Sequence, residues 1–154
     1  MNALPDDRTV GYILESQPLF EDLRQIASQI AGLLMLAAAG SRDASPEHPM
    51  LAAANALLVK TSDGLARVKA GEQVRAHLES LRQAAAALRG ALTAIRALLA
   101  APGSGDLDAP LVPLRAGYDH LQEATRGLPG FRMVAFEQAC CAGTHTAKSS
   151  GVIA

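Results

Sequence analysis

The stretch EQVRAHLESLRQAAAALRGALTAIRALLAA, residues 72–101, is the most regular part of the chain and decides its fold. Apolar residues recur in it at alternating steps of four and three, the heptad spacing that turns one side of a helix towards neighbouring helices. This spacing predicts one long helix, which ends at the glycine- and proline-rich stretch 102–105. Its heptad seam consists of Val74, Leu78, Leu81, Ala85, Leu88, Leu92, Ile95 and Leu99.

The same spacing occurs in the stretch 16–39, before the central helix. Ser16 is a suitable helix cap, Pro18 fits a first turn, and Gly40 follows the last apolar position. We therefore expect a helix from Ser16 to the residue before Gly40, preceded by a loosely ordered arm over 1–15. The predicted seam consists of Leu19, Leu23, Ile26, Ile30, Leu33 and Ala37.

A second helix is predicted between Ser45 and Gly71. Ser45-Pro46-Glu47 is a capping residue followed by a proline and an acid, which is typical of a helix start. Asp63-Gly64 interrupts the helix-forming sequence, and because glycine inside a helix costs about 1 kcal/mol relative to alanine, we expect a kink or break there. The predicted seam consists of Leu51, Ala54, Leu58, Thr61, Leu65 and Val68.

A fourth helix is expected to start between Asp108 and Pro113 and to end near Arg126. The residues predicted on its apolar face are Leu114, Tyr118, Leu121, Thr125 and Leu128. The stretch 131–142 carries two of the three phenylalanines, and it is either a short extra helix or an extended segment laid over the other helices. The polar stretch 143–154 lacks a period and is expected to be a mobile tail.

Composition supports helices and disfavours sheets. The 154 residues include 31 alanines and 22 leucines, whereas aromatic residues make up 3%. Alanine and leucine lose little freedom in a helix, and strands draw on aromatic and β-branched residues. The sequence therefore predicts an all-α protein, an antiparallel four-helix bundle over 16–142 with helices crossing at about 20°.

Four arginines share one side of the central helix. Arg75, Arg82, Arg89 and Arg96 are seven residues apart, and most of the remaining surface of this helix is apolar or small. Such a helix must be covered on nearly every side, so it lies either at the centre of the bundle or in a subunit interface. The arginine row is accordingly a solvated flank, the border of an interface, or a contact for phosphate or acidic partners.

Reactive groups are sparse in this sequence. It has no phosphate-binding loop, nucleophile elbow, dinucleotide-binding glycines or paired metal-binding motif, so we expect no cofactor and no catalysis. The nearest approach to a ligand cluster is Cys140, Cys141 and His145, whose thiols and imidazole suit zinc or copper. Against this, adjacent helical cysteines point about 100° apart, which favours one buried and one half-exposed thiol.

The net charge and the length of the apolar runs limit which kinds of partner and which compartment are expected. The net charge of −1 attracts neither nucleic acid nor anionic lipid, and the strongest apolar stretch, 30–39, is too short to cross a bilayer. Asp6 and Asp7 stand where a secretory signal would place positive charge before an apolar run, and two adjacent cysteines are too few for a disulfide framework. These features favour the cytoplasm, and 11 arginines among 14 basic residues suggest a bacterial source.

Taken together, these patterns predict a non-catalytic helical bundle that acts by protein-protein contact, with itself as a homodimer or with another protein. Its contact surface is expected on the central helix and the phenylalanine-containing stretch 131–142. The alternative is a bundle that binds a small ligand or, through Cys140, Cys141 and His145, a metal ion.

Overall fold

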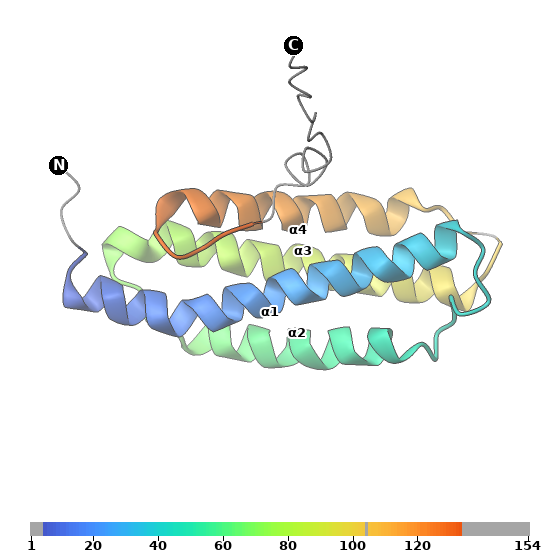
Figure 1. The fold of residues 1–154 in the computed structure, drawn as a ribbon, viewed down its shortest axis with the longest axis horizontal. Helices are drawn as coiled ribbons and strands as arrows, with labels where there is room; N and C mark the ends of the chain where they lie inside the picture. Colours follow the sequence, from blue (N-terminus) through green and yellow to red (C-terminus); the bar gives the residue numbers. More distant parts are fainter. Residues whose placement is uncertain (1–4, 104, 134–154) are drawn as a thin grey trace, which may run out of the picture.

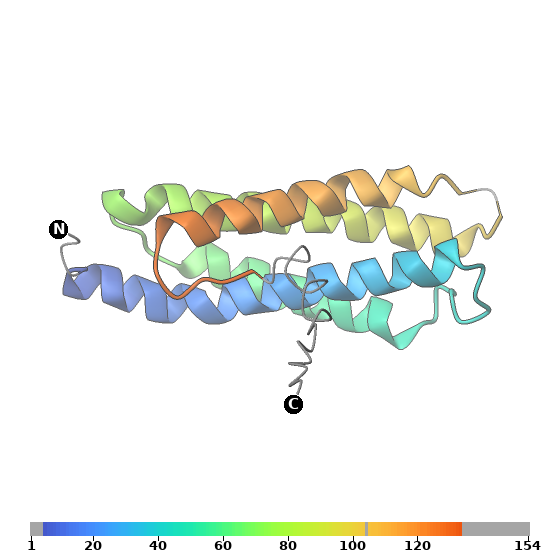
Figure 2. The same ribbon diagram turned by 45° about the horizontal axis from the view of Figure 1, so that its top comes forward.

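The computed structural model describes residues 5–103 and 105–133, and in this part of the chain every long element is a helix (Figure 1). Successive helices run in opposite directions and pack side by side, which confirms the predicted antiparallel four-helix bundle (Figures 1 and 2). A single turn of 3-10 helix, Glu72–Val74, precedes the third helix. The helices are α1 (Asp7–Ala38), α2 (Pro49–Arg67), α3 (Arg75–Ala100) and α4 (Asp108–Gly127).

The first helix begins at Asp7 rather than at Ser16, so the expected arm over 1–15 is wrong for residues 7–15. The side chain of Asp6 accepts a hydrogen bond of 2.8 Å from the backbone N–H of Thr9 and caps the helix. Tyr12 and Ser16 are buried one turn apart, so the added turns pack against the core. Pro18 therefore lies inside the helix, on an exposed side where water can replace its missing hydrogen bond.

The heptad seams are buried as predicted in α2 and α3. All six predicted positions of α2 and all eight of the central helix are buried. In α1, four of six are buried, whereas Leu19 and Ala37 are partly exposed. The second helix begins at Pro49, where the His48 ring caps it, rather than at Ser45, and it ends at Arg67 before Gly71.

The expected break at Asp63-Gly64 is wrong, because α2 is continuous through these residues. A Cβ atom on Gly64 would lie 2.6 Å from Cδ2 of Leu19, closer than real side chains approach. The glycine therefore allows α1 and α2 to pack closely, and this packing offsets its poor helix propensity.

The central position of α3 accounts for its apolar sequence. It contacts α1, α2 and α4, and it buries a second row, His77, Ala84 and Ala91, beside its seam. Leu88 packs directly over Gly117 of α4, since a Cβ at position 117 would be 2.9 Å from Cδ2 of Leu88. Both apolar rows of α3 are thus covered within one chain, and the side that carries the arginine row is exposed.

The buried face of α4 differs from the predicted one. Leu114 and Leu121 are buried as expected, but Tyr118, Thr125 and Leu128 are only partly covered. The face that meets the core consists of Pro110, Leu114, Gly117, Leu121 and Ala124. This face is rotated from the predicted one because Gly117 must sit inward, where α3 and α4 approach each other.

After α4 the chain reverses and returns beside α1 (Figures 1 and 2). Gly130 has a φ of 93°, a left-handed conformation that favours glycine, and its carbonyl accepts a 3.0 Å hydrogen bond from Nε2 of Gln17. Phe131 is buried, and residues 131–133 are not helical. The remainder of the predicted extra segment, 134–142, and the predicted tail, 143–154, lie outside the described residues.

Candidate functional site

The arginine row lies along the junction of α3 with α2. Arg82 donates to the backbone carbonyl of Leu65 at 3.2 Å, Arg89 donates to Oγ of Ser62 at 2.9 Å, and Arg96 donates to Oδ1 of Asn55 at 3.2 Å. Position numbers on α2 fall as those on α3 rise, as antiparallel helices require. All three acceptors are neutral, so the row connects two helices of one chain without losing its positive charge.

Arg75, the fourth member of the row, lies exposed in the first turn of α3. A hollow of about 200 Å³ lies between Arg82 and Arg89, over Ser62 and Ala86. This volume is below the usual range for a small-molecule site, about 300 to 1,000 Å³. The structure therefore gives the row an intramolecular role, and its predicted role at an interface stays a prediction.

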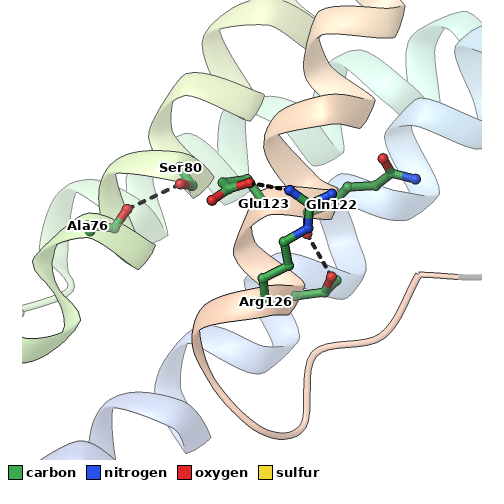
Figure 3. A network of polar contacts seen from close by, with 6 residues as sticks. Ala76, Ser80, Gln122, Glu123 and Arg126 are labelled. Carbon is green, nitrogen blue, oxygen red and sulfur yellow. Dashed lines mark hydrogen bonds and ion pairs between the residues drawn. The ribbon is translucent and has the colours of Figure 1, made fainter.

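Polar contacts around the end of α4 also remain local (Figure 3). Arg126 pairs with Glu123 at 2.9 Å within α4, and Ser80 donates to the carbonyl of Ala76 at 3.2 Å within α3. Exposed pairs of this kind contribute a few tenths of a kcal/mol to their own helix. They bring no convergent set of reactive groups to this surface.

The most unusual polar contact in the core joins α1 to α3. Tyr12 Oη and His77 Nδ1 are 2.7 Å apart and share a hydrogen bond, although both residues are buried. Phe131 covers the imidazole, with ring centroids 4.3 Å apart, and also meets Phe20 edge to face at 5.3 Å. The second imidazole nitrogen, Nε2 of His77, is buried without a hydrogen-bond partner among the described residues.

Burial sets the protonation of this pair. Removal from water lowers the pKa of His77 to about 4 and raises the pKa of Tyr12 to about 12, because both charged forms lose hydration. Both side chains are therefore neutral at pH 7. Tyr12 is 4% exposed and His77 is 6% exposed, and Phe131 packs on the imidazole.

The buried imidazole makes stability depend on pH. As the pH falls below the ordinary histidine value of 6.5, the unfolded chain binds the proton before the folded chain does, because the folded pKa is about 4. The free energy of unfolding is thus fully retained above about pH 6.5 and falls by up to about 3 kcal/mol by pH 4. His77→Phe is expected to remove this part of the loss, as measured by urea unfolding of both proteins across this range.

Urea unfolding curves of wild type and His77→Phe that lose the same free energy between neutral and acid pH would contradict the assignment. Acidic residues affect both proteins equally, so the difference between the curves isolates the imidazole.

An open apolar groove lies between α1 and α4. It has a volume of about 370 Å³, and Arg115 is its one charged lining residue. Helical spacing places two further apolar side chains beside this groove. Met35 lies seven residues after Ser28 on α1, and Val112 lies one turn before Arg115 on α4. Met35 is 72% exposed and Val112 is 66% exposed. The lining residues are Ala27, Ser28, Ala31, Leu111, Leu114, Arg115 and Tyr118.

Neither the groove nor the buried pair was predicted. Tyr118 and Leu114 were expected as core residues, and the sequence carries no signal that α1 and α4 leave a space between them. One sequence feature could have predicted that His77 is buried: it lies seven residues before Ala84 and fourteen before Ala91. That spacing marks a second buried row on α3.

The predicted metal ligands Cys140, Cys141 and His145 lie outside the described residues. Within residues 5–103 and 105–133, no three histidine, cysteine, aspartate or glutamate side chains come together to hold a metal ion. In the same ranges, no helix has both the length and the hydropathy to cross a bilayer. Comparisons with protein-family models, curated proteins and solved structures find no match for this chain.

Proposed function

We propose that this chain is a non-catalytic helical bundle that acts by protein-protein contact, and that a second copy of the chain is its partner. The observation that carries the proposal is the apolar groove between α1 and α4 with Met35 and Val112 beside it. Exposed apolar patches on a surface are typical of interaction sites, and exposed methionine adapts to partners of varied shape.

The charge balance supports a second copy as the partner. The chain has a net charge of −1, so two copies meet without strong repulsion, and the groove itself carries one charge, that of Arg115. The proposed surface lies between α1 and α4, whereas the predicted one includes α3, whose two apolar rows are buried within the chain. Only its exposed flank, with the arginine row, is open to a partner.

Sedimentation velocity of the full chain at micromolar concentration tests the proposal. We expect a dimer for the wild type, and Met35→Glu is expected to weaken the dimer about tenfold or more, because the new carboxylate loses water and no basic residue lies one turn from it on α1. Val59→Glu is the matched control, since Val59 is also exposed, at 56%, but lies on α2. A monomeric wild type, or equal weakening by both substitutions, would overturn the proposal.

A second candidate function is the binding of a small apolar ligand. The groove volume of about 370 Å³ falls within the usual range of ligand sites, and its lining is almost entirely apolar. Native mass spectrometry of freshly purified protein separates the two functions. A bound small molecule in near-stoichiometric amount on a monomer would favour the ligand, and a ligand-free dimer would favour self-association.

A further inference from the structure

The open groove lies on the line of the chain that returns after α4. Gly130 is fixed beside Gln17, Phe131 packs on Phe20, and Met133 packs against the core. The segment thus runs along α1 in the direction of rising residue number, towards the middle of the bundle (Figure 1). The groove begins at Ala27, further along the same helix.

The next residues of the chain have the reach to fill it. From Phe20, Ala27 is seven residues and Ala31 eleven residues further along α1, which at 1.5 Å per residue is about 10 to 16 Å. An extended chain advances about 3.3 Å per residue, so the residues that follow Met133 by one to three positions arrive at this level. These residues are Val134, Ala135 and Phe136.

The chemistry of this stretch matches the groove. Residues 134–142 read VAFEQACCA, in which seven of nine side chains are apolar and the one charged residue is Glu137. The groove is apolar, and its one charge has the opposite sign, on Arg115. We infer that the α1/α4 groove is the docking site of the chain's own segment 134–142, with Phe136 between Ala31 and the face of α4.

This inference rests on the proposed function, because it concerns the same groove. It assigns segment 134–142 of the same chain as the occupant of that groove. Met35 and Val112 lie beside the groove rather than in its lining, so they stay available to a second copy. The docked segment would then form part of the surface that the partner meets. Self-association and docking in the same chain are measured separately.

Fluorescence of a Phe136→Trp variant of the full chain tests the inference. The chain has no tryptophan, so the new indole is the only tryptophan signal. We expect blue-shifted emission that acrylamide quenches several-fold less than free tryptophan, unchanged when the protein is diluted below its association range. Adding Ala31→Glu is expected to shift the emission to that of exposed tryptophan, because a carboxylate then occupies the groove.

Ala97→Glu is the matched control, because Ala97 is an exposed alanine on α3, away from the groove. It is expected to leave the emission unchanged. Should Ala31→Glu lose its helical circular dichroism, Ser28→Glu replaces it, since Ser28 also lines the groove and is exposed.

Three outcomes overturn the inference. The first is exposed emission at every concentration, and the second is blue-shifted emission that survives a folded groove variant. The third is a blue shift that appears only as the protein associates, which would place the segment in the groove of a second copy. The first two outcomes are independent of the sedimentation result, and the third occurs only in a protein that associates, so failure of the inference is distinguishable from failure of the proposed function.

Discussion

Leu88→Ala is expected to lower the free energy of unfolding by about 2 to 5 kcal/mol. Leu88 is fully buried on α3, and its side chain fills the space above Gly117 of α4. Truncation removes apolar burial and leaves a cavity that rigid helices fill only in part. Urea unfolding followed by circular dichroism measures the change.

Leu14→Ala is the matched control, because Leu14 is 67% exposed on α1 and should change stability by less than about 0.5 kcal/mol. A second variant tests the contact itself. Gly117→Ala is expected to destabilise the wild type, since its Cβ would lie 2.9 Å from Cδ2 of Leu88, but to be tolerated once Leu88 is alanine. Strictly additive effects would contradict the described packing of α3 on α4.

Phe131→Ala is expected to cost about 3 to 5 kcal/mol, although Phe131 lies outside the helices. The ring is 3% exposed and packs against both Phe20 and His77. Its removal also opens the imidazole to water, which raises the pKa of His77 towards its ordinary value of 6.5. The loss of stability between neutral and acid pH should therefore shrink in this variant.

Urea unfolding of Phe131→Ala at neutral pH and near pH 4 measures both effects. Unchanged stability at neutral pH would show that the returning segment contributes nothing to the core. Lost stability with an unchanged pH dependence would show that the phenylalanine does not shield the imidazole.

The helices that could be predicted best are those whose seams follow an unbroken heptad. Every position of the seams predicted over 51–68 and 74–99 is buried, because alternating steps of three and four determine which side of a helix turns inward. The start of α1 differs from the predicted one, because Pro18 also fits the first turn of a helix. The cap formed by Asp6 and Thr9 is an equally valid start signal, and the burial of Tyr12 favours it.

The buried face of α4 differs from the predicted one for another reason. A pattern of apolar residues does not assign glycine to the buried face of a helix. Gly117 nevertheless lies on the buried face, because only a residue without a side chain lets α4 approach Leu88. Helix-to-helix distance is a property of two sequences together, so one periodic pattern cannot reveal it.

The candidate site depends on contacts between distant parts of the chain. Tyr12 and His77 are 65 residues apart, and Phe131 joins them only because the chain reverses at Gly130. The spacing of apolar residues predicts which face of its helix each residue occupies. Which residues of two helices contact each other depends on how the helices are arranged in space. The groove is a region where α1 and α4 do not pack closely, and residue spacing alone does not predict such a region.

Site-specific photo-crosslinking shows whether the α1/α4 side of the bundle is the surface at which two copies meet. A photoreactive benzoylphenylalanine replaces Val112 beside the groove or Val59 on α2, and each purified full-length protein is irradiated at micromolar concentration. We expect covalent dimers from position 112 and few or none from position 59. Equal yields at the two positions, or no dimer at position 112, would contradict this expectation.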